Sequence, residues 1–175
     1  VTCAHCFNAL GNEYPQVGGK YEVVHHTQLL NRLVRAKKLV PVASVQEDVT
    51  YHDPCFLGRH NKVYDAPREL MAASGSTLKE MPRHGERSMC CGAGGARMWM
   101  EEKIGKRINI DRVDEALDTL GGSTTATQKI ATGCPFCRVM LNDGVTARQE
   151  AGGNDNVEVI DVSQMLLSSI TRLDS

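Results

Sequence analysis

The chain has 175 residues, of which 41% are hydrophobic, and its formal net charge at pH 7 is −1. This length can bury the core of one compact domain or of two small, closely packed ones, and the near-neutral charge argues against nucleic acid as a partner. No apolar run approaches the ~18 residues of a membrane-spanning helix, so we expect no membrane span within these residues.

The first forty residues are predicted to be the end of an α/β unit. The chain begins at Val1 rather than at a methionine, which indicates a fragment of a longer protein. A strand end is predicted to run into the turn Cys3-x-x-Cys6 and then into a helix. A short strand over 21–25 follows, and then a second helix with Thr27 at its N-cap.

The rest of the chain is predicted to alternate strands with helices. The predicted strands cover residues 49–52, 77–81 at a sheet edge, 129–132 and 157–160. The predicted helices start near Asp65, Ala96, Arg107, Cys134 and Ser163, the first and last of these starts being N-caps, and the helix from Arg107 ends at Gly121 and Gly122. This order favours an α/β fold with a mostly parallel sheet flanked by helices, in which ligands gather beyond the carboxyl ends of the strands.

The two ends of the chain carry the same features in the same order. Each has a strand, a C-x-x-C turn, a helix, a Gly-Gly break, a second strand and a capped helix. This agreement indicates a tandem repeat. We therefore expect residues 1–41 to be the tail of a truncated first unit and residues 42–175 to be a complete second unit, the two packed as one compact body.

The seven cysteines are spaced as metal ligands rather than as a disulfide framework. Cys3 and Cys6 lie in the truncated unit, and the complete unit contains Cys55, Cys90, Cys91, Cys134 and Cys137. An odd count with two C-x-x-C turns and an adjacent pair is typical of metal ligation in a reducing compartment. Two thiolates about 4 Å apart repel by roughly 4 kcal/mol at an effective dielectric near 20, so a cation is needed to keep both ionised. Five soft thiolates exceed the four ligands of a structural zinc site and favour a polynuclear iron–sulfur centre.

Other residues near the cysteines are predicted to support this site. Gly92, Gly94 and Gly95 follow the adjacent pair and let the backbone turn sharply and approach a bound group closely. Four histidines are also candidates: His25, His26, His52 and His60. Because five thiolates already fill the proposed site, we expect these histidines to form hydrogen bonds at strand ends instead.

A resemblance to a known family rests on three motifs: Cys55, the triplet Cys90-Cys91-Gly92 and the turn Cys134-Pro135-Phe136-Cys137. They resemble the cysteine-rich CCG domain of heterodisulfide reductase and of glycolate oxidase iron–sulfur subunits. The stretches 23–27, 52–59 and 90–95 are similar to the C-terminal part of actinobacterial iron–sulfur oxidoreductases linked to electron-transfer flavoprotein.

The resemblance implies an iron–sulfur electron-transfer module of a respiratory oxidoreductase. It implies a [4Fe–4S] cluster, noncubane as in heterodisulfide reductase, held by the five cysteines of the complete unit. It makes Cys3 and Cys6 the last two ligands of the first unit. Electrons would pass between a flavoprotein and a quinone or a disulfide, in the cytoplasm at the inner face of the membrane, where upstream segments hold the protein. The fragment is not expected to be active alone, and its isolated site is expected to keep a cluster, take up zinc or be empty.

Two other interpretations remain open. A zinc-stabilised structural and docking domain would use the same cysteines, and some members of the family carry zinc in one unit. A glutaredoxin-like dithiol protein would use Cys134 and Cys137, with a lowered pKa at the first of them. The second interpretation leaves Cys55, Cys90 and Cys91 without a role.

Overall fold

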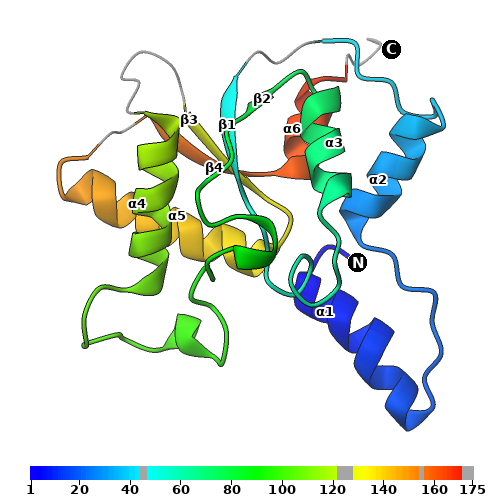
Figure 1. Cartoon of the computed structure of the whole chain (residues 1–175), viewed down its shortest axis with the longest axis horizontal. Coiled ribbons are helices and arrows are strands. Elements are labelled where there is room, and N and C mark those ends of the chain that lie inside the picture. Colours follow the sequence, from blue (N-terminus) through cyan, green and yellow to red (C-terminus); the bar gives the residue numbers. More distant parts are fainter. Residues whose placement is uncertain (44–46, 122–127, 154–155, 171–175) are drawn as a thin grey trace.

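The computed structural model describes residues 1–43, 47–121, 128–153 and 156–170 (Figure 1). Within these ranges the chain forms a four-stranded sheet in the order β2-β1-β3-β4, and every pair of neighbouring strands is parallel. The strands are β1 (Asp48–His52), β2 (Thr77–Leu78), β3 (Gln128–Thr132) and β4 (Val157–Asp161). The predicted α/β class with a parallel sheet is confirmed. The strand that starts at Thr77 lies at the sheet edge as expected, although it is shorter than predicted.

Helices cover both faces of the sheet (Figure 1). One face is covered by α3 (Asp65–Ala73) and α6 (Val162–Ser168), with α2 (His26–Arg35) packed against both, and the other face by α4 (Ile108–Leu120) and α5 (Pro135–Glu150). At the carboxyl end of the sheet, α1 (Ala4–Asn8) continues as a π-helical turn (Ala9–Glu13) and a 3-10 turn (Tyr14–Val17) that project from the body. Two further 3-10 turns cover Gly85–Arg87 and Arg97–Trp99. None of the described helices has the length and apolar character that crossing a bilayer requires.

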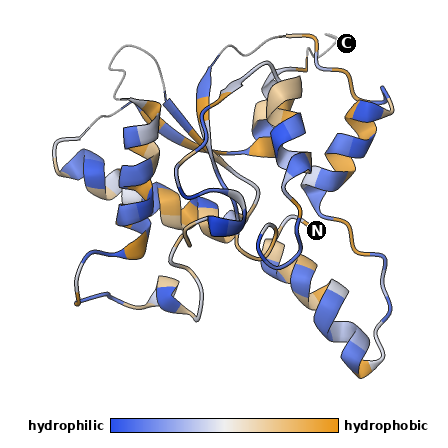
Figure 2. Ribbon diagram, viewed as in Figure 1, coloured by the Kyte–Doolittle hydropathy of each residue, from blue (hydrophilic) through white to orange (hydrophobic). Residues whose placement is uncertain are grey.

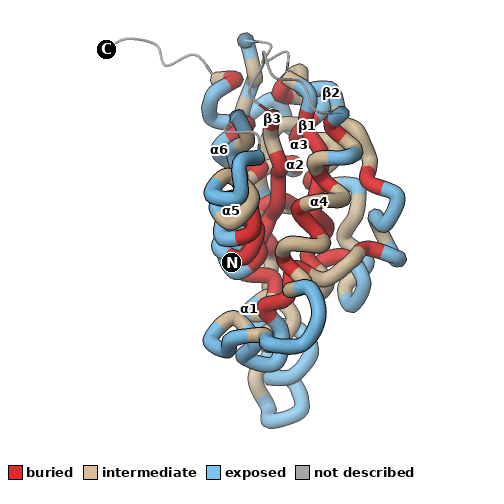
Figure 3. The backbone as a smooth tube through the Cα atoms, turned by 90° about the vertical axis from the view of Figure 1, so that its left-hand side faces the viewer, coloured by how far each residue is buried: buried red, intermediate tan, exposed pale blue. Residues whose placement is uncertain are grey.

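The two central strands, β1 and β3, are mostly buried because both of their faces are covered. Side chains alternate along a strand, so Val49 and Tyr51 of β1 pack toward α3 and α6, while Ile130 of β3 packs toward α4 and α5. Figure 3 shows most of β1 and β3 as buried, whereas most of the segment that follows α1 is exposed. The helices mix hydrophobic with hydrophilic residues, as helices with one buried face do (Figure 2).

Two helix N-caps differ from the sequence prediction. The N-cap of α2 is His25 rather than Thr27, and the N-cap of α6 is Asp161 rather than Ser163. In both helices the residue two positions after the cap donates its backbone N–H to the cap side chain, and a glutamine three positions after the cap accepts the N–H of the cap residue. Thr27 and Ser163 instead bond the cap side chains through their hydroxyls, at 2.8 and 2.6 Å.

The predicted helix that starts at Ala96 is another difference. In this segment the helical structure is limited to one 3-10 turn over Arg97–Trp99. The turn follows Ala96, which has the left-handed conformation (φ 62°). Trp99 and Ile104 are exposed by 80% and 95%, so a helix here would have no apolar face to bury, and short helices without packing are not stable. Helix α3 also begins at Asp65 itself instead of being capped by it.

The predicted strands at the N-terminal end, before Cys3 and over 21–25, do not join the sheet. The amino group of Val1 donates to the carbonyl of Val24 at 2.9 Å, and the N–H of His26 donates to the carbonyl of Val1 at 2.8 Å. These two segments therefore lie side by side outside the sheet. The left-handed Gly121 (φ 77°) ends α4 as predicted, and Gly122 lies outside the described residues.

A substitution at Gly144 tests the contact between α4 and α5. A Cβ added there would lie 2.9 Å from Cγ2 of Val113 and 3.1 Å from the carbonyl oxygen of Asn109. Overpacking of this kind costs about 1–3 kcal/mol, more than the gain of about 1 kcal/mol in helix propensity. We expect Gly144→Ala to lower the free energy of unfolding in urea. Gly11→Ala is the control, because nothing lies within 4 Å of its added Cβ, and a comparable loss there would contradict the packing argument.

The buried N-cap of α2 predicts a pH dependence of stability. His25 is fully buried, and burial lowers its pKa from 6.5 to about 4. Between these pH values the folded chain therefore binds fewer protons than the unfolded chain. Above pH 6.5 His25 causes no loss in the free energy of unfolding, and as the pH drops from 6.5 toward 4 the free energy of unfolding falls. Between pH 7.5 and 5.0 the loss from His25 is about 2 kcal/mol.

Urea denaturation of two variants at both pH values measures this contribution. His25→Asn keeps a good N-cap without a titrating ring, so its pH-dependent loss of stability should be smaller than that of the wild type by about 2 kcal/mol. The exposed His60 provides the matched change His60→Asn, which should retain the wild-type pH dependence. If His25→Asn also retains it, the buried ring is not the source.

Candidate metal centre

The two central strands bring the cysteines to one edge of the sheet. β1 and β3 pair up to their last residues, His52 and Thr132, so the loops that contain Cys55 and Cys134 leave the sheet side by side. This arrangement of the two strands is confirmed as expected. The adjacent cysteine pair comes from the long loop between β2 and α4, and Cys137 lies in the first turn of α5.

The five sulfurs of the complete unit form one continuous series of contacts. The thiol of Cys90 interacts with Cys55 on one side and with Cys91 on the other, and both contacts lower its pKa. Cys91 is in turn in contact with Cys137, and Cys137 with Cys134. Cys91, Cys134 and Cys137 are buried, and Cys55 and Cys90 are half-buried. The structure thus places all five thiols in one cluster, with all seven cysteines of the chain unpaired by disulfides.

Crowding shifts the pKa values of these thiols in opposite directions. The hydrogen bond from Cys137 lowers the pKa of Cys134 to about 4, and the same contact raises the pKa of Cys137. The contact between Cys55 and Cys90 likewise lowers the pKa of Cys90 and raises that of Cys55. Protein groups alone therefore let only some of the thiols ionise, whereas a cation among them favours the thiolate at every position.

Backbone N–H groups point at the sulfurs that carry charge. The N–H of Gly92 donates to Cys90 Sγ at 3.3 Å. The N–H groups of Ala4 and Cys137 stabilise the thiolate of Cys134 in the same way. Gly92 needs its left-handed conformation (φ 89°), and a Cβ there would lie 3.2 Å from Cβ of Ile108. The backbone at Gly92 therefore comes close to a cysteine sulfur in a conformation that a side chain would disfavour.

A Cβ added at Gly94 or Gly95 would meet nothing within 4 Å in the described part of the chain, so both positions border open space. They lie on the wall of a pocket of about 320 Å³. Its lining residues are His5, Ala93, Gly94, Gly95, Ala96, Met98, Trp99 and Phe136. Gly92 thus has its backbone N–H on a cysteine sulfur, while Gly94 and Gly95 border the pocket; their predicted role in holding a bound group stays a prediction.

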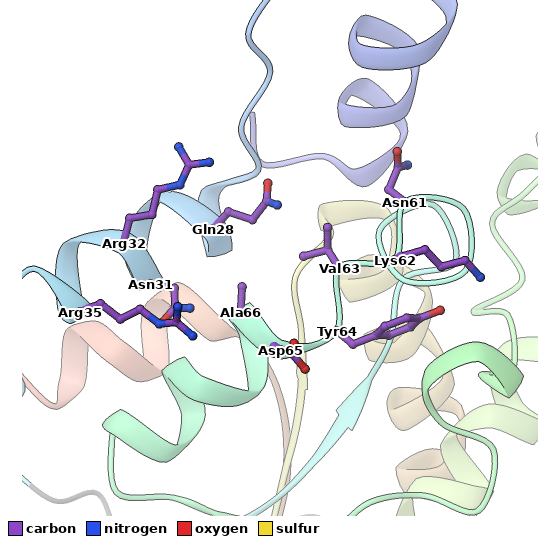
Figure 4. A pocket seen from close by; sticks show the side chains of 10 residues that line it. All are labelled: Gln28, Asn31, Arg32, Arg35, Asn61, Lys62, Val63, Tyr64, Asp65 and Ala66. Atoms are coloured by element: carbon purple, nitrogen blue, oxygen red, sulfur yellow. The ribbon is translucent and has the colours of Figure 1, made fainter.

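A second pocket lies away from the cysteines, between α2 and the segment that enters α3 (Figure 4). Its volume is about 420 Å³, and polar side chains of α2 line it together with residues 61–66, which run from the loop into the first turn of α3. Arg35 and Lys62 on its walls form ion pairs with Glu69 and Glu86. None of the described residues that line this pocket is a cysteine, so the pocket is separate from the cysteine cluster.

Cys3 lies against the cluster, whereas Cys6 is exposed. Ligand atoms of Cys3, His5 and Cys134 all lie within 4.8 Å of one another, and Cys3 Sγ is 4.0 Å from His5 Nδ1. His5 is also hydrogen-bonded to Cys134, and its ring packs against Phe56 with centroids 4.5 Å apart. His5 was not among the site residues predicted from the sequence. Its place inside the turn Cys3-Ala4-His5-Cys6 is the signal that would have found it.

His52 also lies next to the cluster. One of its ring nitrogens and the sulfurs of Cys91 and Cys137 all lie within 4.8 Å of one another, and the residue is 1% exposed. Its Nδ1 accepts a hydrogen bond from Nε of Arg112 at 3.1 Å. The other three predicted histidines are further from this role: His25 caps α2, His26 bonds Asp161 at 3.1 Å, and His60 stacks on Phe56.

The donor set fits a polynuclear thiolate-bound centre. Five contiguous thiols, mostly buried and approached by backbone N–H groups, match the thiolate ligation and hydrogen bonding of iron–sulfur clusters. A single tetrahedral metal ion would use four of them at most.

Comparisons with known proteins agree with this chemistry. Three relatives are "Probable iron-sulfur-binding oxidoreductase FadF" of Bacillus subtilis, "EtfAB:quinone oxidoreductase" of Syntrophomonas wolfei and one subunit of "Dihydromethanophenazine:CoB--CoM heterodisulfide reductase" of Methanosarcina barkeri. They are 44%, 46% and 37% identical over 97%, 95% and 81% of this chain, which spans 23%, 23% and 34% of their lengths. No solved structure matches the chain.

The relatives and the clustered cysteines together support an iron–sulfur cofactor. The model of the CCG family, described as a cysteine-rich domain, matches residues 49–142, which include all five clustered cysteines. The chain therefore belongs to the CCG cysteine-rich domain family.

Proposed function

We propose that this chain is the iron–sulfur electron-transfer module of a respiratory oxidoreductase. The observation that carries the proposal is the continuous series of contacts among five cysteine sulfurs at the carboxyl edge of the sheet. A series of five exceeds what a single zinc ion uses. The names of the relatives, which include an iron–sulfur-binding oxidoreductase and an EtfAB:quinone oxidoreductase, support the same conclusion.

The bound group would be a [4Fe–4S] cluster of the noncubane type. Its ligands would be Cys55, Cys90, Cys91, Cys134 and Cys137. When bound, the cluster supplies one-electron transfer. The protein contributes a largely buried site, and the N–H groups of Gly92 and Ala4 stabilise the anionic sulfurs there.

The electron donor in this proposal is a flavoprotein, and the acceptor is a quinone or a disulfide. A quinone is dissolved in the bilayer, so the module would work in the cytoplasm at the inner face of the membrane. Access is provided where Gly94, Gly95 and Trp99 line the apolar pocket beside the cluster. Trp99 is 80% exposed on this surface, which makes it the natural place for a partner to approach.

A tandem arrangement of CCG units is also part of the proposal, with residues 1–41 ending the first unit and 42–175 forming the second. Two matching local structures support it. Cys3 is the N-cap of α1 as Cys134 is the N-cap of α5. The later helix of each unit starts with a capping box, at His25 in one and at Asp161 in the other. Cys3 and Cys6 would then serve the centre of the first unit.

A zinc-stabilised docking domain is the second candidate. The observation that favours it is the group of Cys3, His5 and Cys134, because two thiolates and an imidazole within 4.8 Å are a common set of zinc ligands. The glutaredoxin-like alternative uses only Cys134 and Cys137. It leaves unexplained why Cys137 is also in contact with Cys91.

Metal analysis of anaerobically purified protein distinguishes the two candidates. We expect several iron atoms per chain together with acid-labile sulfide, and an EPR signal after one-electron oxidation or reduction. Zinc at one equivalent per chain with no iron, both as purified and after anaerobic reconstitution with iron and sulfide, would overturn the redox proposal in favour of the docking domain.

Serine substitutions test how the cysteines are divided between the units. Cys91 lies in the middle of the sulfur series, so Cys91→Ser should abolish iron incorporation on anaerobic reconstitution. Cys6 is exposed, and Cys6→Ser should leave the iron content unchanged, as should Cys3→Ser if Cys3 serves the other unit. Equal loss of iron in all three variants would show that the division is wrong.

A further inference from the structure

Arg112 on α4 is a buried charge with three defined partners. Its side chain is fully buried. Its Nη1 donates to the carbonyl of Arg83 and to the carboxylate of Glu115, both at 2.9 Å, and its Nε donates to Nδ1 of His52 at 3.1 Å. The guanidinium is thus held in place by α4 and the loop before it, and its remaining strong contact is the imidazole at the end of β1.

This contact fixes where the proton of the imidazole lies. A guanidinium has only N–H donors and stays protonated in proteins. The ring nitrogen that faces it must therefore present a lone pair, which excludes a proton on Nδ1. A neutral imidazole carries one proton, so the proton of His52 is on Nε2.

Nε2 of His52 is buried and has no hydrogen-bond partner in the part of the chain that the structure describes. The thiols of Cys91 and Cys137 are neighbours of this ring, since a ring nitrogen of His52 and the two sulfurs lie within 4.8 Å of one another. A protonated ring nitrogen has no lone pair for a metal ion. This group of three is therefore not a metal-ligand set, and the N–H is a donor that awaits an anionic acceptor.

We propose that His52 donates its Nε2–H to the thiolate sulfur of Cys91 or Cys137 when the centre is formed, and that Arg112 enforces this tautomer. The inference rests on the proposed function, because it assumes an iron–sulfur centre at these sulfurs. A hydrogen bond to a cluster sulfur stabilises the more negative, reduced state and raises the reduction potential. His52 and Arg112 are thus positioning residues that tune the centre without ligating it.

The tautomer is measurable in the wild-type protein before any iron is present. In metal-free, fully reduced protein labelled with ¹⁵N-histidine, the two ring nitrogens differ in chemical shift according to which one carries the proton. We expect a protonated Nε2 and an unprotonated Nδ1 for His52 at neutral pH. A proton on Nδ1, or on both nitrogens, would overturn the inference whatever metal the protein binds.

Redox titration of the reconstituted protein tests the consequence. His52→Leu removes the donor, and we expect the reduced-to-oxidised ratio at a fixed ambient potential to fall about tenfold, which is about 59 mV for a one-electron couple. His52→Gln offers an amide N–H at nearly the same reach, and it should restore most of the potential. His60→Leu is the matched control because the ring of His60 is exposed, and its potential should equal that of the wild type.

The outcomes separate the inference from the function on which it rests. Wild-type protein that takes up no iron refutes the proposed function, while the tautomer measurement still decides the state of His52. Iron-loaded His52→Leu with full iron content and an unchanged potential refutes the inference alone. If His52→Leu fails to fold, the decision passes to His52→Gln and to the tautomer of the wild type. A potential of His52→Gln about 59 mV below that of the wild type counts against the proposal. A proton on Nδ1 of His52 in the wild type also counts against it.

Discussion

The repulsion among five sulfurs is the constraint on which the site depends. At an effective dielectric near 20, one pair of thiolates about 4 Å apart costs roughly 4 kcal/mol, and the structure places five sulfurs in an unbroken series. Protein groups relieve part of this repulsion by leaving thiols such as Cys55 and Cys137 protonated. A metal cluster would relieve the rest, because its cations favour ionisation at every position.

Holding such a set together requires loops that cannot spread apart, and buried ion pairs supply that rigidity. Asp53, two residues before Cys55, is 1% exposed and accepts two hydrogen bonds from Arg68 of α3, at 2.8 and 2.9 Å. The same carboxylate accepts the N–H of Gly85 at 2.8 Å. The segment that follows Gly85 leads to Cys90, so one buried carboxylate ties the first cysteine loop to the second. Breaking one partner of a buried pair is far more costly than losing a surface contact.

The sequence was sufficient for the parts of this structure that follow from local pattern. Alternating strands and helices predicted the parallel sheet, and the proline after Asp53 marked the end of β1, so the meeting of the cysteine loops could be expected. The helix predicted from Ala96 failed, because local propensity does not show whether an apolar residue such as Trp99 finds a surface to cover. Arg112 was not foreseen either, since a charged residue in an amphipathic helix is expected to face solvent.

The role of the first forty residues shows why the boundary of a unit and the boundary of a site need not coincide. The proposed repeat divides the chain near residue 41, yet the first turn of α1 lies against the cysteines of the following segment. Ala4 is fully buried, and its N–H points at the sulfur of Cys134, while His5 forms a hydrogen bond to the same sulfur. An N–H donor to a sulfur influences a cluster wherever in the chain it originates. The environment of Cys134 is therefore built jointly by both segments, even if each segment supplies ligands only to its own centre.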